Sequence, residues 1–108
     1  MEKKKDLNIS YNIDYNRDWN EKIIKRDRNK KDIRFDQHVF DREDYRELDL
    51  NKVEETVRKG KIIERKCEEP NKICFQHYFG KENITYIVII RDWKEFIEVK
   101  TAWTKKGR

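Results

Sequence analysis

The sequence predicts an α+β domain in which two N-terminal helices pack on an antiparallel β-meander of at least four strands. Its 108 residues are enough for one domain. After Gly60 the hydrophobic pattern changes from a helical period to a period of two, which is typical of half-buried strands. The connectors between the strand-like runs are only a few residues long, and such short connectors join neighbouring antiparallel strands as hairpins.

The composition favours a polyanionic partner such as nucleic acid. Charged residues make up 45% of the chain and the formal net charge is +5. A basic excess on a densely charged surface attracts phosphates more readily than acidic ligands. The same richness in charge is also compatible with codon bias or with a stabilising charge network.

The cysteines and the apolar runs exclude several classes of protein. Cys67 and Cys74 have no companion ligands at zinc-like spacing, so neither a metal site nor a cofactor is expected. The polar N-terminus lacks the apolar core of a signal peptide. The longest apolar run, 84–90, has the length of a strand and not of a membrane span. We therefore predict a cytoplasmic protein with free thiols and no membrane partner.

The N-terminal region could add one strand and a basic connector. Residues 1–7 are a charged lead-in, and 8–15 alternate apolar and polar side chains as a half-buried strand does. The basic residues of the following segment are Lys25, Arg26, Arg28, Lys30 and Lys31. They would contact nucleic-acid phosphates, or they would form a solvated linker.

The first predicted helix begins at Asp36 or Gln37, where a carboxylate suits the helix dipole. In a helix, His38, Arg42 and Arg46 would lie along one stripe, because successive members are four residues apart. An imidazole beside two planar guanidinium groups suits the chemistry of a phosphodiester. The alternative is a solvated helix face on which the arginines pair with neighbouring carboxylates.

The second predicted helix follows directly. Asp49 is its expected N-cap, Leu50, Val53 and Val57 form its apolar stripe, and Gly60 ends it.

Four strands are predicted at 61–67, 72–79, 84–91 and 95–103. The third is apolar on both faces and should lie inside the sheet. In the fourth, the alternation predicts one face that packs on the helices, formed by Ile97, Val99, Thr101 and Trp103.

Further aromatic candidates lie on the strands and turns. His77 alternates with apolar residues, so a packed histidine is favoured over a catalytic one. Tyr78 falls on the opposite face and is the more accessible side chain, suited to contact a phosphate. Trp93 and Trp103 could stack on bases or cap the sheet.

The residues at 35–103 resemble a family of small prokaryotic domains. The resemblance consists of the His38, Arg42 and Arg46 series, a helix with a Gly-x-Ile-Ile turn at 60–63, and a meander that ends near Thr101. The chain is similar more distantly to the RelE and BrnT toxins and to barnase-like, EndoU-like and colicin-type ribonucleases. The resemblance implies a RelE-like domain at 35–108, with 1–34 as an extension outside the family pattern.

The resemblance further implies a metal-independent RNA endonuclease of the toxin type, neutralised by an antitoxin partner. It marks His38, Arg42, Arg46 and Thr101 as catalytic. In such chemistry His38 would transfer the proton, the arginines would stabilise charge on the phosphate, and the substrate's own 2′-hydroxyl would be the nucleophile. Two other classes remain open: a nucleic-acid-binding module without catalysis, and a protein-interaction domain that docks a partner at a strand edge.

Overall fold

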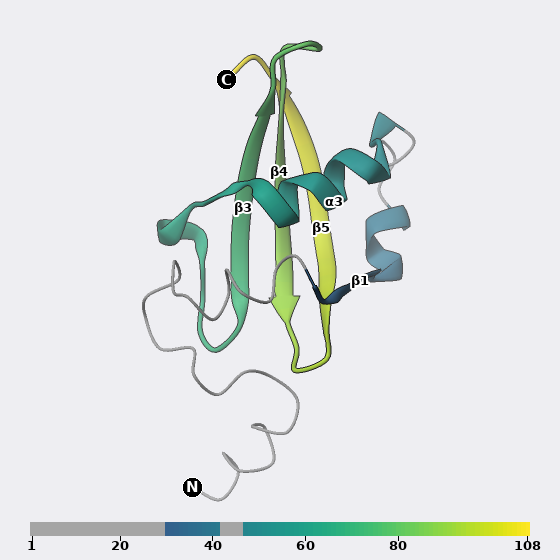
Figure 1. Cartoon of the computed structure of the whole chain (residues 1–108), viewed down its shortest axis with the longest axis vertical. Helices are drawn as coiled ribbons and strands as arrows, with labels where there is room; N and C mark the ends of the chain where they lie inside the picture. Colours follow the sequence, from purple (N-terminus) through teal and green to yellow (C-terminus); the bar gives the residue numbers. More distant parts are fainter. Residues whose placement is uncertain (1–29, 42–46) are drawn as a thin grey trace, which may run out of the picture.

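The computed structural model describes residues 30–41 and 47–108. In chain order its elements are β1 (Asp32–Phe35), the 3₁₀ helix η1 (Gln37–Asp41), α3 (Leu50–Lys59), β2 (Lys61–Ile62), the 3₁₀ helix η3 (Glu64–Lys66), β3 (Lys72–Phe79), β4 (Ile84–Asp92) and β5 (Phe96–Lys106) (Figure 1). The strand predicted at 8–15 and most of the predicted basic connector lie outside the described residues.

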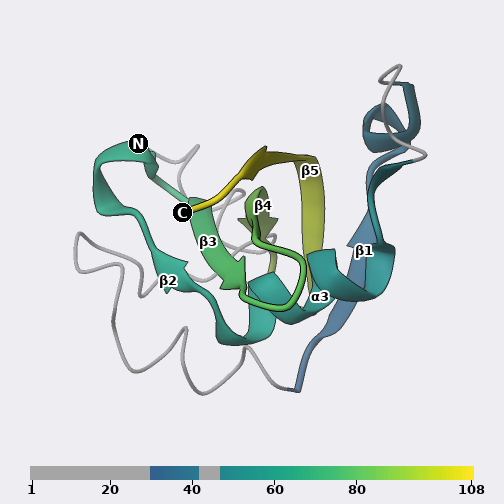
Figure 2. The ribbon, with the colours of Figure 1, turned by 90° about the horizontal axis from the view of Figure 1, so that it is seen from above.

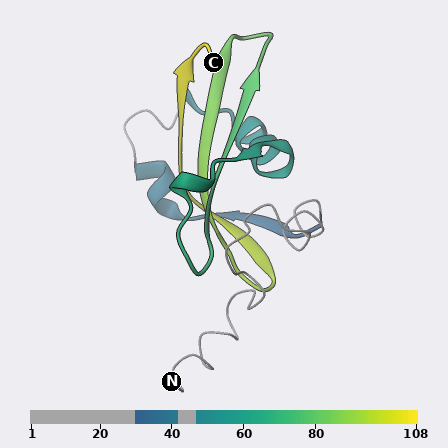
Figure 3. The same cartoon turned by 90° about the vertical axis from the view of Figure 1, so that its left-hand side faces the viewer.

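The strands form one five-stranded sheet with the order β1-β5-β4-β3-β2. Strands β2 to β5 pair in antiparallel fashion, whereas β1 pairs in parallel with β5. Figure 2 shows β3, β4 and β5 as a curved layer, with β1 beyond β5. The chain must therefore pass from one edge of the sheet to the other between β1 and β2, and α3 makes this crossing over one face (Figure 3).

The predicted fold class is wrong, because the described residues contain one α-helix and a mixed sheet where two helices and an antiparallel meander were expected. The first predicted helix was expected to begin at Asp36 or Gln37; among the described residues a 3₁₀ helix occupies Gln37–Asp41, and the residues before it form β1. Ile33 and Phe35 alternate with polar neighbours, and pairing with Ile97 and Val99 turns both toward the core. This local period of two is stabilised by β5, which is more than sixty residues away in the sequence.

The second predicted helix is confirmed as α3. The Asp49 side chain accepts a hydrogen bond from the Asn51 amide at 2.9 Å, which satisfies one of the unpaired donors of the first turn. Val53 and Val57 are completely buried against the sheet. Arg58, in the last turn, pairs with Glu54 one turn earlier at 3.1 Å.

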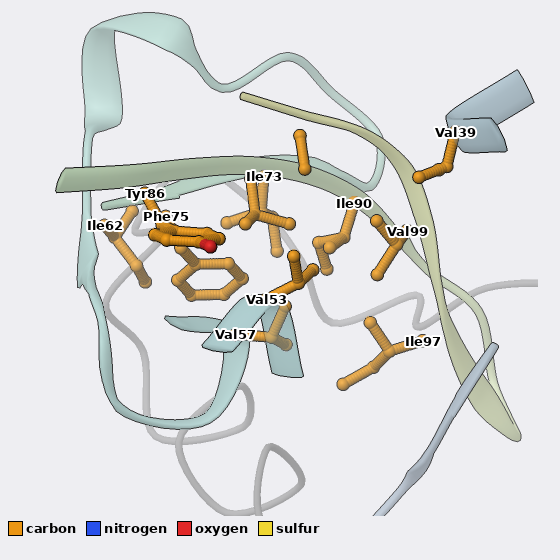
Figure 4. Packing of buried hydrophobic residues seen from close by; sticks show 12 residues of the cluster. Val39, Val53, Val57, Ile62, Ile73, Phe75, Tyr86, Ile90, Ile97 and Val99 are labelled. Atoms are coloured by element: carbon orange, nitrogen blue, oxygen red, sulfur yellow. The ribbon is translucent and has the colours of Figure 1, made fainter. Parts of the chain in front are cut away.

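The core lies between α3 and the sheet face that it covers (Figure 4). Its central residues come from the helix and from the three long strands: Val53, Val57, Ile73, Phe75, Tyr86, Val88, Ile90, Ile97, Val99 and Ala102. Val39 of η1 joins the same cluster and is completely buried. This contact packs the short helix against the sheet beside β5.

Of the four strands predicted after Gly60, the one at 72–79 coincides with β3. The first of the four, at 61–67, and the last, at 95–103, differ from the structure. Only Lys61 and Ile62 of the run predicted at 61–67 form a strand, and η3 follows. The last strand extends to Lys106, three residues beyond the prediction, because Lys105 and Lys106 still pair with β4.

A β-bulge in β5 corrects the predicted face of Thr101. Val99 aligns with Ile90 and Thr101 with Ile89, so Lys100 is an extra residue in the pairing. The buried core position after the bulge is Ala102. The bulge therefore moves Thr101 to the sheet face opposite to that of Val99.

Gly60 is required by close packing. Its φ of −72° is open to any residue, but an added Cβ would lie 2.9 Å from the Gln76 carbonyl oxygen and would also clash with the Thr56 carbonyl oxygen. Because both neighbours are backbone atoms, neither can move aside cheaply. We expect Gly60→Ala to lower the free energy of unfolding by about 1–3 kcal/mol in urea titrations.

Gly80 provides the matched control for this substitution. A Cβ there would meet only the Tyr78 ring at 3.7 Å, an ordinary contact distance. Gly80→Ala should therefore change the stability by less than about 0.5 kcal/mol. Equal losses in the two variants would contradict the packing explanation.

Candidate functional site

The candidate site lies at the end of β1, where the backbone is held against β5. The Asp36 amide donates to the Val99 carbonyl oxygen at 2.9 Å, which continues the β1–β5 pairing by one more bond. The Asp36 carboxylate then accepts a hydrogen bond from the His38 amide at 3.1 Å, in a turn typical of Asp at the start of a helix. This local geometry fixes the carboxylate relative to η1.

The same carboxylate contacts two side chains. Oδ1 of Asp36 lies 3.2 Å from Nδ1 of His38, and Oδ2 accepts from the Lys100 ammonium. Lys100 is the bulged residue of β5 and also lies 3.8 Å from a carboxylate oxygen of Glu98. We call these three side chains the Asp36–His38–Lys100 cluster.

The cluster keeps Asp36 ionised. The hydrogen bond from Lys100, followed by that from the His38 amide, holds the pKa of the Asp36 carboxyl below its usual value. An ionised carboxylate can only accept hydrogen bonds, so the 3.2 Å contact favours the His38 tautomer with its proton on Nδ1. In neutral His38 the unprotonated nitrogen is then Nε2, and the side chain is 73% exposed. The arrangement therefore favours one tautomer of an exposed imidazole.

A pH-dependent contribution to stability should follow from the lowered pKa. Because the carboxyl is more acidic in the folded state, its contribution is complete above the ordinary pKa of 3.8 and is lost as the pH falls through the folded value. We expect Asp36→Asn to be less stable than wild type at pH 7, with the difference vanishing in acid. Urea unfolding measured from neutral to acidic pH checks this.

Asp32→Asn is the control for this experiment, because Asp32 is an exposed side chain only four residues earlier. The free energy of unfolding of Asp32→Asn should equal that of wild type across the whole pH range. If the free energy of unfolding of Asp36→Asn stayed equally far below that of wild type in acid, the charge of Asp36 would not be the stabilising feature.

The structure describes only some of the other predicted site residues. Arg42, Arg46, Lys25, Arg26 and Arg28 lie outside the described residues. Thr101 pairs with Ile89 on the sheet face that α3 does not cover. Lys30 is exposed, whereas the Lys31 side chain is only 10% exposed and its ammonium lies 2.7 Å from Asp92. Lys31 therefore anchors the chain before β1.

Tyr78 lies in a second location, separated from β1 by β4 and β5. It lines a hollow of about 430 Å³ together with Lys59, Lys61 and Arg108. His77, which was predicted to be packed, stacks edge-on against Phe79 with the ring centroids 4.7 Å apart. The structure thus does not combine Tyr78 and His38 into one site.

Trp93 and Trp103 each contact a neighbouring charged side chain. The Trp93 indole donates to a carboxylate oxygen of Glu98 at 2.9 Å. The Lys66 ammonium lies 5.8 Å from the Trp103 ring centroid. Both arrangements fit the capping alternative.

The sequence singled out His38 as a candidate but did not indicate the contacts of Asp36 with His38 and Lys100. The Asp-x-His spacing is a usable signal, because an Asp side chain often bonds the backbone two residues ahead. Nothing in the local pattern marks Lys100, since the bulge that places it depends on the pairing with β4.

The cysteines are poorly suited to nucleophilic chemistry. Burial raises the pKa of the Cys67 thiol to about 11, and it also raises that of Cys74. Among residues 30–41 and 47–108, no three His, Cys, Asp or Glu side chains are grouped so that they could hold a metal ion. No helix in the same part of the chain is long and apolar enough to cross a membrane.

Comparison with known proteins gives no match: no family model, no curated protein and no solved structure is significantly similar to this chain.

Proposed function

We propose that the protein is a metal-independent RNA endonuclease of the toxin–antitoxin type, in which His38 transfers the proton of the 2′-hydroxyl. The observation that carries this proposal is the contact between Asp36 and Nδ1 of His38. A carboxylate that orients a histidine leaves the other ring nitrogen in position to act as a base. The resemblance of the His38, Arg42 and Arg46 series to small ribonuclease domains supports the same reaction.

In the proposed reaction Nε2 of His38 removes the proton from the ribose 2′-hydroxyl. The 2′-oxygen attacks the adjacent phosphorus, and the bond between phosphorus and the 5′-oxygen breaks. A proton from solvent or from a neighbouring acid reaches the leaving 5′-oxygen. The products are a 2′,3′-cyclic phosphate and a 5′-hydroxyl, so the proposed reaction balances without an external oxidant or metal.

Positive charge near the phosphate would stabilise the negative charge that develops in the transition state. Lys100 supplies one ammonium group beside Asp36, close to the base. Arg42 and Arg46 are the proposed additional cations, and Thr101 is the proposed hydroxyl that orients a phosphate oxygen. Thr101 lies on the sheet face that α3 does not cover.

The test is cleavage of end-labelled RNA by the purified full chain with EDTA present. The proposal expects cleavage that EDTA does not inhibit and products that end in 2′,3′-cyclic phosphate. DNA of the same sequence should remain intact, because it lacks the 2′-hydroxyl. Cleavage that is abolished by EDTA, or that produces other ends, would contradict the mechanism.

The proposal also includes a biological setting. An RNA endonuclease of this type would act in the cytoplasm, and an antitoxin protein would neutralise it. Expression of the chain alone should then arrest bacterial growth, and expression of a neighbouring small gene should relieve the arrest.

A further inference from the structure

A basic hollow lies at the end of the sheet where β3 meets the β3–β4 turn. Lys59 from the end of α3, Lys61 from β2 and Arg108 surround it, and Gln76, His77 and Tyr78 of β3 form its wall. Figure 1 shows the last residues of the chain beside the end of β3. Its volume of about 430 Å³ falls within the range of about 300–1,000 Å³ of small-ligand sites.

The three cations of the hollow differ from the other basic residues near them. Lys52 contacts Asp49 and Glu82, and Arg58 contacts Glu54. Within the described part of the chain, Lys59, Lys61 and Arg108 make no ion pair, and no Asp or Glu lines the hollow. Their charge is therefore available to an anion.

The wall of the hollow is held in place. The Tyr78 hydroxyl donates to the Asn83 side chain at 2.6 Å, and the Arg108 guanidinium lies 4.4 Å from the Tyr78 ring centroid. The buried Thr85 hydroxyl donates to the Gly107 carbonyl oxygen at 2.6 Å, and the Gly107 amide donates to the Asn83 carbonyl oxygen at 2.8 Å. These bonds fix the backbone that carries Arg108, so a ligand would meet a preorganised arrangement.

We propose that the basic hollow binds a phosphate group of single-stranded nucleic acid. Two ammonium groups and a planar guanidinium suit phosphate oxygens, and the guanidinium stacked on an aromatic ring offers a flat surface to an adjacent base. The site uses none of the residues of the Asp36–His38–Lys100 cluster. Its binding function is therefore independent of the proposed cleavage at His38.

The test measures binding of a fluorescent single-stranded DNA to the full chain by anisotropy at several salt concentrations. DNA is chosen because it cannot be cleaved by attack of a 2′-hydroxyl, so the result does not depend on catalysis. We expect Lys61→Ala and Arg108→Ala each to weaken binding several-fold, by up to about tenfold. Each should also reduce the slope of log affinity against log salt by about 0.7.

Lys94→Ala is the matched control, because Lys94 is an exposed lysine in the turn at the other end of the sheet. It removes the same charge and should change affinity by less than about twofold. An equal loss in Lys94→Ala and Lys61→Ala would overturn the proposal in favour of general charge attraction.

Competition identifies the ligand chemistry. Unlabelled RNA of the same sequence should displace the DNA from the His38→Ala variant, which lacks the proposed base, whereas inorganic phosphate should do so only at far higher concentration. If inorganic phosphate displaced the DNA as well as RNA does at the same concentration of phosphate groups, the ligand of the hollow would be free phosphate. If polyglutamate displaced the DNA better than RNA does, the ligand would be an acidic protein. Either result would overturn the proposal.

Discussion

Replacing His38 with alanine is expected to lower the rate of RNA cleavage by about 10²- to 10⁴-fold, the usual contribution of a general base. The substitution removes Nε2, the ring nitrogen that does not contact Asp36 and is the proposed base. Because the side chain is 73% exposed, its loss should leave the fold intact. Single-turnover cleavage of labelled RNA, together with a thermal melt, measures both expectations.

His77→Ala is the matched histidine control for the chemical step and is measured at RNA concentrations that saturate binding, because His77 also lines the basic hollow. His77 packs edge-on against Phe79 and lies 3.9 Å from a carboxylate oxygen of Glu55, far from β1 in the strand order. It should retain cleavage activity within a few-fold of wild type. If His38→Ala cleaved as fast as wild type, or if His77→Ala lost as much activity, the proposed base would be wrong.

Asp36→Asn separates positioning from proton transfer. The amide side chain keeps the shape of the carboxylate but removes the charge that holds the proton on Nδ1 of His38, so kcat should fall with a changed pH–rate profile. A loss of activity in Asp36→Asn with an unchanged pH profile would indicate a merely structural role for the carboxylate.

Truncation of Phe75 to alanine is expected to destabilise the fold by about 3–5 kcal/mol. Phe75 is completely buried in the cluster between α3 and β3, where its strand neighbours across the sheet are Ile62 and Val88. Removing the ring leaves a cavity that the surrounding strands cannot close without breaking their pairing. Urea unfolding followed by tryptophan fluorescence gives the change in midpoint and slope.

Phe40→Ala is the control of the same chemistry at a position that is 38% exposed. It should cost less than about 1.5 kcal/mol, since less apolar surface returns to water. Because a loss of about 3–5 kcal/mol can unfold a small domain, Phe75→Leu is the second variant and should cost about 1 kcal/mol. Equal effects of Phe75→Ala and Phe40→Ala would contradict the assigned core.

The elements that could be predicted are those whose signals are local. The Asp49 cap and the apolar spacing of Val53 and Val57 define α3 within a short stretch of sequence, and the structure has the helix there. The alternation in 72–79 likewise matches β3. The hydrogen-bond partners of α3 lie within the helix itself, and those of β3 include the strand β4 that follows it across one tight turn.

The candidate site was only partly accessible to the same reasoning. His38 stood out by residue type, and the Arg42 and Arg46 part of its stripe falls outside the described residues. Thr101 was misplaced because alternation along a strand assumes regular pairing, and one extra residue at Lys100 reverses it. The hollow around Tyr78 combines residues from α3, β2, β3 and the end of the chain, so no single stretch of sequence points to it.

The sequence by itself determined the local structure of α3 and the long strands, together with the basic character of the surface, because periodicity, capping and charge are properties of neighbouring residues. The tertiary structure alone decided that Ile33 and Phe35 form a strand parallel to β5, and that the bulge brings Lys100 to Asp36. The first depends on pairing between segments more than sixty residues apart, and the second on irregular pairing of β5 with β4 across one turn. The local alternation of Ile33 and Phe35 is too short to specify a strand alone, and burial against the distant strand β5 stabilises it.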